Sequence, residues 1–367
     1  MLIIQQTAAK SYSLRFFSIS LMATMAVVMT MSGCAGSSDP TVKLRGKTMG
    51  TTYSIKYLPG GKQLDSVDVQ ARVEAELATV NQQMSTYIPT SEVSKFNQAT
   101  STEWIEVSKE TAEVVALAQE ISELTAGAFD VTVGPLVDLW GFGPTQRTEQ
   151  EPSNEQIRSV RALTGFQKLH VRTTPPSLRK DVPDLRIDLS AIAKGHGVDR
   201  VSHVLAELGI ENYFVEIGGE VSTGGFRADG APWQVGIERP EELASSLQAV
   251  VGLTGKSMAT SGDYRNYYEI AGKRFSHTID AATGRPVDHK LASASVIADN
   301  CALADALATS MMALGPERAQ ALAEQQHWTV LLITRNNEEF QSVTTLDFAK
   351  YFTSDPDSAN SPNANLR

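Results

Sequence analysis

The chain has 367 residues, of which 42% are hydrophobic and 20% are charged, as in ordinary globular proteins. This length allows one large domain or two small ones. The formal net charge of −10 argues against a nucleic-acid partner, because binding to a phosphate backbone requires clustered Lys and Arg. An anionic ligand is still compatible with this charge if a divalent cation held by acids lies between the two.

The N-terminal residues have the pattern of an export signal. Lys10 and Arg15 precede a long apolar stretch that ends in Met-Ser-Gly-Cys at Cys34. Basic residues, an apolar stretch and small residues at its end predict a signal peptide over residues 1–33. The ending resembles a bacterial lipobox, which implies a lipid on Cys34 and a tether over residues 34–45. The alternative is an uncleaved anchor, since the stretch approaches the roughly 18 residues of a membrane span. Both alternatives place the rest of the chain outside the cytoplasm.

The sequence has only two cysteines, Cys34 and Cys301. With Cys34 lipidated, Cys301 has no disulfide partner, and we expect it to pack as a small apolar core residue. A zinc site built from thiolates is excluded by this count.

Periodicity along the mature chain predicts a mixed α+β fold with two lobes around a cleft, followed by a disordered polar tail over residues 353–367. Apolar residues at spacings of three and four predict helices, and alternation predicts strands. In chain order, we expect a strand at 51–58, helices at 66–86 and 108–125, a glycine-punctuated segment at 125–144, a capped helix at 153–165, a strand and turn at 185–195, a helix at 197–209, strands and turns from 212 to 262, a helix at 302–315 and a strand at 327–336.

The segment DLSAIAKG, residues 188–195, contains the first candidate binding residues. If a strand ends at Asp188 and a helix begins near Gly197, free backbone N–H groups lie beside Lys194. Such helix N-termini attract anions. The segment matches neither a Walker loop nor the G-x-G-x-x-G pattern, so a plain glycine-rich connection is the alternative.

Asp305 and Thr309 are a candidate metal pair. They are four residues apart, so they share one face of the predicted helix at 302–315. A carboxylate and a hydroxyl are hard oxygen ligands of the kind that Mg²⁺ prefers. The alternative is structural, with Thr309 bonded to its own helix backbone and Asp305 acting as a cap.

His277 lies in a loop, residues 276–288, that is rich in Gly, Pro and Asp. A histidine titrates near neutral pH and could accept a proton in catalysis. A purely structural histidine is the alternative.

Two segments suit a flat aromatic ligand. Met49, between glycines, is a soft partner for an aromatic ring, and an ordinary turn before a strand is the alternative. Phe129, Trp140 and Phe142 form an apolar wall with one acid, Asp130, although core packing explains the same pattern. In the later segment VEIGGEV, two glycines add backbone freedom and the acids are expected to be solvated strand residues.

Eight stretches occur in the order in which the ApbE family has them: GKTMGTTY, MSTYIPTSEVSKFN, GAFDVTVGPLVDLWGFG, DLSAIAKGHGVDR, VEIGGEV, TSGDYRNYYE, SHTIDAATGRPV and ADALATSMMALG. The chain therefore resembles the ApbE family from about Gly46 to about Gly315, which is nearly the whole mature chain. Any one stretch alone would be ambiguous, but eight in order leave little room for coincidence. The resemblance implies a catalytic domain over residues 46–352.

The resemblance also implies a reaction and a site. Members of this family bind FAD with Mg²⁺, split its pyrophosphate, attach FMN to a Ser or Thr hydroxyl of an acceptor protein through a phosphoester bond, and release AMP. The implied Mg²⁺ ligands are the side chains of Asp305 and Thr309 and the carbonyl of Ala191. Some relatives have a second acid where this chain has Ala308, so we expect fewer carboxylates or more water around the metal. The implied FAD contacts are Met49, Tyr87, Ala128, Phe129, Asp130, Asp188, Lys194 and Ile279.

Within this resemblance, His277 is the expected acceptor of the hydroxyl proton, with Asp280 orienting it. Mg²⁺ and Lys194 would neutralise the pyrophosphate in an otherwise acidic protein. The expected partners are acceptor subunits of the sodium-pumping NADH:quinone oxidoreductase or a related redox complex. The expected location is the periplasmic side of the inner membrane, with the outer membrane as the alternative. Rival functions are an FAD pyrophosphatase, a flavin-binding lipoprotein without turnover and a generic solute-binding lipoprotein.

Overall fold

The computed structural model describes most of the chain after the predicted export signal. The described residues are 40–143, 150–241, 247–263, 267–270, 273–336, 339–345 and 347–353. The predicted signal peptide, Cys34 and residues 354–367 of the predicted tail lie outside these ranges. The chain divides into Met1–Pro40 and a second unit, Thr41–Arg367, to which almost all the described residues belong. Within the described ranges, no helix is long and apolar enough to cross a membrane.

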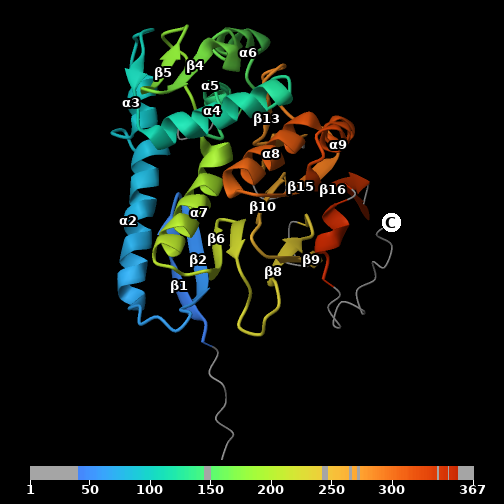
Figure 1. Cartoon of the computed structure of the whole chain (residues 1–367). Helices are drawn as coiled ribbons and strands as arrows, with labels where there is room; N and C mark the ends of the chain where they lie inside the picture. Colours follow the sequence, from blue (N-terminus) through green and yellow to red (C-terminus); the bar gives the residue numbers. More distant parts are fainter. Residues whose placement is uncertain are drawn as a thin grey trace, which may run out of the picture. The chain divides into compact units, whose positions relative to one another are not determined.

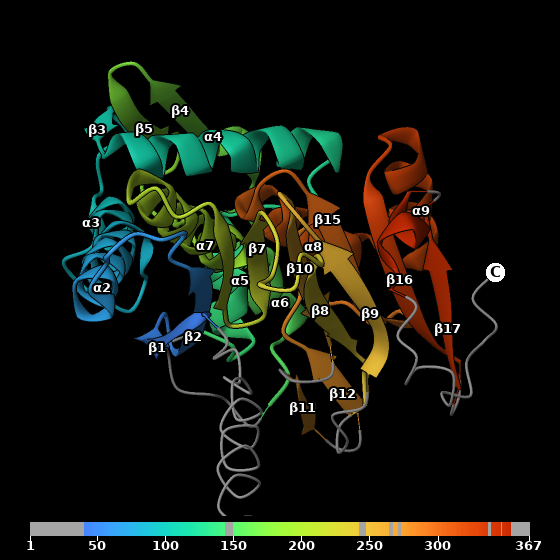
Figure 2. The same ribbon diagram turned by 60° about the horizontal axis from the view of Figure 1, so that its bottom comes forward.

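In the described part of the chain, an eight-stranded antiparallel sheet forms the centre of this unit (Figures 1 and 2). Every neighbouring pair of its strands is antiparallel. The alternating residues that predicted a strand at 51–58 form a strand of this sheet with the same bounds. In spatial order, the strands are β1 (Val42–Thr48), β2 (Thr51–Leu58), β6 (Asn212–Ile217), β7 (Glu220–Gly224), β10 (Ser257–Gly262), β15 (Leu291–Ala298), β16 (Thr329–Asn336) and β17 (Glu339–Thr344).

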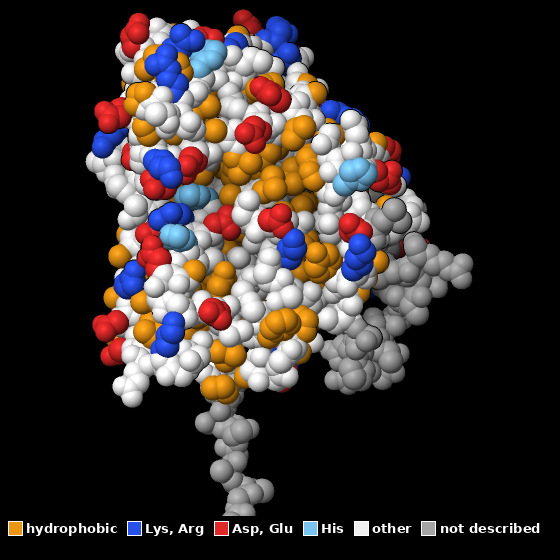
Figure 3. Space-filling view, viewed as in Figure 1, with side chains coloured by type: hydrophobic (Ala, Val, Ile, Leu, Met, Phe, Trp, Pro, Cys, Tyr) orange, Lys and Arg blue, Asp and Glu red, His pale blue; other side chains and the backbone are white. Residues whose placement is uncertain are grey.

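Three long helices cover one face of the sheet: α2 (Ser66–Met84), α7 (Ser190–Glu207) and α8 (Cys301–Leu314). The helix α7 packs against β6 and β7, and α8 packs against β10 and β15. Because α8 is buried almost all round, its sequence is apolar on every side. Figure 3 shows hydrophobic side chains gathered at the centre of this face, with acidic and basic side chains interspersed around them.

The opposite face of the sheet carries a hairpin, β8 (Trp233–Glu238) and β9 (Leu247–Leu253). Alternate residues of each sheet strand point to opposite faces. Accordingly, Leu331 packs with the hairpin residues Val235 and Val251, whereas its neighbour Leu332 packs in the core under α8. The central strands are therefore buried on both sides.

A second group of elements stands beside the long helices. It contains the sheet β3–β5–β4, which packs on α4, and two small hairpins that pack with α5 and α6 around Trp140. Trp140 donates from Nε1 to the carbonyl of Gly284, and Tyr268 donates to the carbonyl of Trp140. The remaining elements are α3 (Glu92–Gln98), β3 (Ile105–Glu106), α4 (Lys109–Leu124), α5 (Gly134–Leu139), α6 (Asn154–Arg161), β4 (Leu169–Thr173), β5 (Pro176–Lys180), β11 (Tyr267–Ile270), β12 (Lys273–Ser276), β13 (Ile279–Asp280), β14 (Arg285–Pro286), α9 (Pro316–Gln325) and two short 3₁₀ turns, Phe166–Lys168 and Phe348–Tyr351.

The predicted fold class is confirmed, but some predicted boundaries are wrong. The first strand begins at Val42, so part of the predicted tether belongs to the sheet. Residues 185–189 form no strand, and the helix expected from Gly197 begins at Ser190. Lys194 therefore lies within a helix and not in a turn before one. The glycines that suggested a turn instead lie inside α7, where they allow this helix to pack very closely against its neighbours.

Candidate active site

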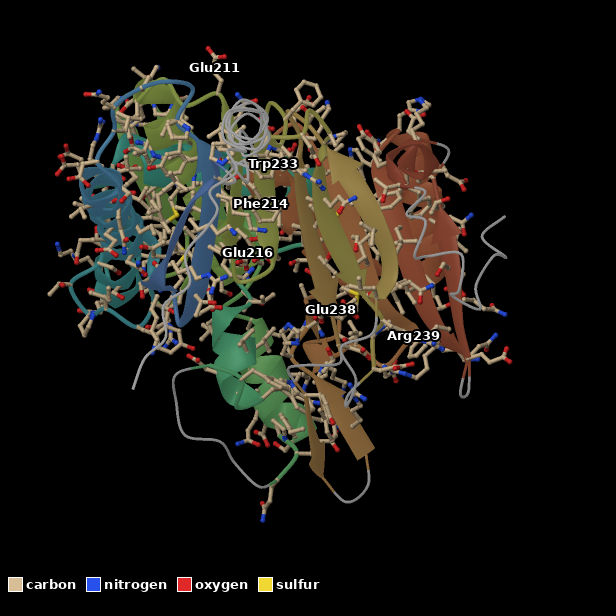
Figure 4. All side chains as sticks on the ribbon, turned by 90° about the horizontal axis from the view of Figure 1, so that it is seen from below. Glu211, Phe214, Glu216, Trp233, Glu238 and Arg239 are labelled. Carbon is tan, nitrogen blue, oxygen red and sulfur yellow. The ribbon has the colours of Figure 1, made fainter. Side chains whose placement is uncertain are left out.

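A cleft of about 800 Å³ gathers most of the predicted site residues. This volume suits a large organic ligand. The loop after β6 and the strand β8 border the cleft, and Figure 4 shows Glu216 on β6 and Glu238 on β8 from below. Tyr87 lies in its lining with 70% of its surface exposed. The predicted site residues in the lining are Tyr87, Ala128, Phe129, Asp130, Asp188, Ala191, Lys194, His277, Ile279, Asp305 and Thr309.

A charged cluster of two buried acids and one half-buried lysine lies in this cleft. The ammonium Nζ of Lys194 lies 2.8 Å from Oε1 of Glu220 and 3.4 Å from Oδ1 of Asp305. The other carboxylate oxygen of Asp305 accepts a 3.0 Å hydrogen bond from the backbone N–H of Gly195. Glu220 and Asp305 are 3% and 2% exposed. The cluster joins α7, α8 and β7, three elements that are far apart in the sequence.

The glycines of α7 allow this cluster to form. A Cβ on Gly195 would lie 2.3 Å from the backbone oxygen of Cys301, the first residue of α8. Asp199, one turn later on α7, accepts hydrogen bonds from the backbone N–H groups of Cys301 and Ala302. The N-terminus of α8 is thus held against α7, and this contact brings Asp305 to Lys194.

The cluster contains two carboxyl groups and one ammonium. Burial raises the pKa of Glu220 to about 8, although Lys194 opposes this effect. Burial also raises the pKa of Asp305, and again Lys194 acts against it. Burial alone would lower the pKa of Lys194, but the two carboxylates outweigh it and the pKa is raised. Lys194 therefore keeps its charge, and two acids share one ammonium. A divalent cation or a bound phosphate with its counterion would change this balance.

The oxygen atoms near the cluster fit Mg²⁺. Asp305, Thr309 and Ala191 all line the cleft, and they offer a carboxylate, a hydroxyl and a backbone carbonyl. The structural alternative for this pair does not hold. Asn300, not Asp305, caps α8 by accepting from the N–H of Leu303. Thr309 shares a 3.2 Å hydrogen bond with Ser261 of β10, across the cleft lining.

No group of three or more His, Cys, Asp or Glu side chains able to hold a metal occurs within the described residues. Any Mg²⁺ held here would therefore need the hydroxyl, the carbonyl, water or a ligand's phosphate to complete its coordination. Mg²⁺ commonly keeps several waters and uses few protein carboxylates.

His277 lies in the cleft lining, with its ring edge toward Phe142 and the two ring centroids 6.4 Å apart. Asp280 does not line the cleft. Its carboxylate accepts hydrogen bonds from the N–H of Ala282 and the hydroxyl of Thr283, both within its own β13–β14 turn. His277 thus lies within the cleft lining, whereas the carboxylate of Asp280 holds the shape of its own turn.

Met49 and Trp140 also lie outside the cleft lining. Met49 sits in the β1–β2 turn at a φ of 49°, and its side chain packs onto Gly197 of α7. Trp140 is 1% exposed in the core, so core packing was the right explanation for this residue. Asp130 lines the cleft but uses its carboxylate on the N–H groups of Thr132 and Phe166, and burial raises its pKa.

Glu220 is the residue that the sequence reasoning missed, because it was expected to be solvated. Every residue of β7 is buried. The sequence does contain a sign of this burial. Glu220 follows the pair Gly218–Gly219 and is the first residue of a short strand that lies between other apolar strands. A charged residue at the start of a central strand needs a buried partner.

Comparison with known proteins now gives the family. The cleft, the lysine–carboxylate cluster and the antiparallel sheet covered by helices define a ligand-binding α+β protein with the features of an enzyme site. The family model described as the ApbE family matches residues 49–332, and the chain belongs to the ApbE family.

The chain is 44% identical to a FAD:protein FMN transferase from Vibrio cholerae over 329 residues, which are 90% of this chain and 98% of that protein. It is 38% identical to the Escherichia coli K12 protein of the same name, covering 92% and 99%. The solved structure of the flavin transferase ApbE from Vibrio cholerae has a TM-score of 0.80 at 44% identity, covering 86% of this chain and 100% of that chain. The apo flavinyl transferase ApbE of Pseudomonas stutzeri has a TM-score of 0.79 at 39% identity, covering 86% and 97%.

Proposed function

We propose that this chain transfers the FMN part of FAD to a Ser or Thr hydroxyl of an acceptor protein. The observation that carries the proposal is the Lys194–Glu220–Asp305 cluster, with both acids buried, in a cleft of about 800 Å³ in a chain of this family. The acceptor oxygen forms a bond to the phosphorus of the FMN half, and the bond from that phosphorus to the bridging oxygen breaks. AMP leaves with the bridging oxygen.

The chain's own residues supply binding and charge. Lys194 offers its ammonium to the pyrophosphate while Glu220 holds that ammonium in place. Asp305, Thr309 and the carbonyl of Ala191 would hold Mg²⁺, which when bound neutralises phosphate charge and stabilises the leaving group. Tyr87 and Phe129 offer aromatic surface to the flavin or the adenine, and Asp188 is in reach of the same ligand in the cleft lining.

His277 takes the proton of the acceptor hydroxyl as the new bond forms. Its place in the cleft lining supports this role. A positioned general base typically contributes about 10² to 10⁴ in rate. Asp280 supports the base indirectly, by closing the turn that follows it.

One experiment separates this function from its rivals. The purified protein is incubated with FAD, Mg²⁺ and a candidate acceptor protein, and the acceptor is weighed by mass spectrometry. An added mass equal to one FMN residue supports the transferase. Free FMN and AMP without labelled acceptor would instead indicate an FAD pyrophosphatase. Bound flavin with neither product would indicate a binding protein without turnover.

The partners and the location belong to the same proposal. The acceptors are subunits of the sodium-pumping NADH:quinone oxidoreductase or of a related redox complex. The chain works on the periplasmic side of the inner membrane, held by a lipid on Cys34. Mass spectrometry of the mature N-terminus tests the lipid, and membrane fractionation of a Cys34→Ala variant tests the anchor. Release of the wild-type protein into the soluble periplasmic fraction would contradict this location.

A further inference from the structure

The loop that carries Asp188 into the cleft has no regular secondary structure of its own. Residues 181–189 connect β5 to α7 and form neither helix nor strand. Asp188 accepts a 2.8 Å hydrogen bond from the N–H of Ser190, and its own N–H donates to the carbonyl of Val131 at 2.7 Å. These bonds hold Asp188 itself, and other bonds hold the residues directly before it.

Leu185 and Ile187 of this loop are buried in the core, but Asp188 itself has open space on two sides. Asp188 lines the main cleft and also a second cavity of about 190 Å³. Ile187, Arg186 and Asn97 line the second cavity as well. Arg186 forms an ion pair with Asp138, but its side chain is 46% exposed, and exposed pairs contribute little.

The side chain of Asn97 clamps the backbone directly before Asp188. Its Nδ2 donates to the carbonyl of Ile187 at 2.8 Å, and its Oδ1 accepts from the N–H of the same residue at 2.8 Å. The side-chain amide of Asn97 thus binds both the N–H and the carbonyl of Ile187, which is 90 residues away in the sequence. A side-chain amide suits this pairing, because it has a donor and an acceptor side by side and carries no charge.

A buried lysine ties the same two segments together. Lys180 is 0% exposed, and its ammonium donates to the carbonyls of Phe96 and Leu185 at 3.1 and 3.0 Å. Phe96 and Asn97 are neighbours on α3, and Leu185 lies in the loop of Asp188. The helix α3 is therefore joined to this loop twice, by the side chain of Asn97 and through the ammonium of Lys180.

The same helix also holds the segment that carries Tyr87. Ser91, its N-cap, donates to the carbonyl of Ser85, and Ser94 donates to the same carbonyl. The N–H of Tyr87 donates to the hydroxyl of Ser85. One short helix thus connects Tyr87 and Asp188, two residues of the cleft lining.

From these contacts we infer that Asn97 is a positioning residue for FAD, which acts through Asp188, with Lys180 as its buried support. This inference rests on the proposed function, since it takes Asp188 to be an FAD contact. It assigns a role to the conspicuous Asn at the end of MSTYIPTSEVSKFN, which neither the cleft nor the metal site explains.

A double-mutant cycle on FAD affinity tests the inference. The variants are Asn97→Ala, Asp188→Ala and the double variant, and flavin fluorescence gives the dissociation constant of FAD without acceptor protein. Each single variant should weaken FAD binding about ten-fold, the effect of losing one good hydrogen bond. If Asn97 acts through Asp188, the double variant should be no weaker than Asp188→Ala. The KM for FAD should rise with these changes more than kcat falls.

The control is Gln98→Ala, since the neighbouring Gln98 amide bonds the carbonyl of Pro89 on the exposed side of the same helix. This variant should bind FAD normally. If Asn97→Ala fails to fold, Asn97→Asp is used in the same cycle, because it keeps the bond from the Ile187 N–H and loses the bond to the Ile187 carbonyl. Lys180→Met should show the same dependence on Asp188.

The possible failures are distinguishable. Unchanged FAD affinity in Asp188→Ala would overturn the proposed FAD contact and the inference with it. A weakened Asp188→Ala beside an unchanged Asn97→Ala would overturn the inference alone. Equal and additive losses in the double variant would mean that Asn97 acts on the cleft by another route, and would also overturn it.

Discussion

Gly195 and Cys301 lie so close together that no side chain fits between them. A Cβ at Gly195 would be 2.3 Å from the backbone oxygen of Cys301. This contact sets the distance between α7 and α8, and that distance brings the ammonium of Lys194 to the carboxylate of Asp305. The chemistry of the cleft therefore depends on a packing contact just behind it.

We predict that Gly195→Ala lowers both stability and FAD binding. The added methyl group meets backbone and not a flexible side chain, so the two helices must move apart at a cost of about 1 to 3 kcal/mol. Urea unfolding measures the first effect and flavin fluorescence the second. Gly197→Ala is the matched control, because its methyl group would meet the flexible end of Met49 at 2.8 Å. Comparable losses in the two variants would mean that the Gly195 contact has no special importance.

Thr309 gives a sharp test of the proposed metal site. Thr309→Val keeps the shape of the side chain and removes the hydroxyl, whereas Thr309→Ser keeps the hydroxyl. We expect Thr309→Val to weaken Mn²⁺ binding, measured by electron paramagnetic resonance, by about ten-fold, and Thr309→Ser to bind nearly as the wild type. Asp305→Asn should bind more weakly than either. Wild-type Mn²⁺ affinity in both Thr309→Val and Asp305→Asn would place the metal elsewhere.

His277→Ala should slow flavin transfer by about 10² to 10⁴ while leaving FAD affinity within about three-fold. The reason is that a base is needed for the transfer step and not for binding. Single-turnover transfer to an acceptor protein measures the rate. Asp280→Asn is the comparison: it keeps one acceptor oxygen for the turn and loses the other, which should lower the rate modestly and leave the pH dependence of the rate unchanged. A shifted pH profile in Asp280→Asn would restore Asp280 as the residue that orients His277.

Several parts of this structure could be predicted from the sequence because they follow from a repeating pattern. The spacing of Val69, Val73 and Leu77 predicted α2, and all three are buried against the sheet. The spacing of Asp305 and Thr309 placed both on one face of α8, and both line the cleft. Such patterns work because one element buries one face.

Other parts of the structure could not be predicted, because they depend on contacts with residues far away in the sequence. Glycine in the segment of Lys194 suggested a turn, yet Gly195 and Gly197 are helical and make room for Cys301 and Met49. The burial of Glu220 depends on Lys194, which lies on another element. The order of the family's motifs located the cleft, but it could not show which of their residues pack outside it.

The last prediction concerns pH and the half-buried His196. Burial is the largest cause that lowers the pKa of His196 to about 4, and Arg200 adds to it, while Glu110 and Glu76 act the other way. Its buried Nε2 has no hydrogen-bond partner within the described residues. The folded state therefore binds fewer protons here than the unfolded state between the folded pKa and the ordinary value of 6.5. The contribution of His196 to the free energy of unfolding is therefore complete above pH 6.5 and is lost as the pH falls toward 4.

Replacing His196 by Gln should reduce this acid sensitivity. Urea unfolding at about pH 7 and about pH 5 gives the free energy of unfolding of each variant. The wild type should lose about 1 to 2 kcal/mol more than His196→Gln over this interval. The difference between variants is the relevant quantity, because Asp199 and Glu220 have raised pKa values and change stability in the opposite sense. His203→Gln, at an exposed position of the same helix, should keep the wild-type sensitivity. An equal acid sensitivity in the wild type and His196→Gln would show that His196 is protonated without cost in the folded protein.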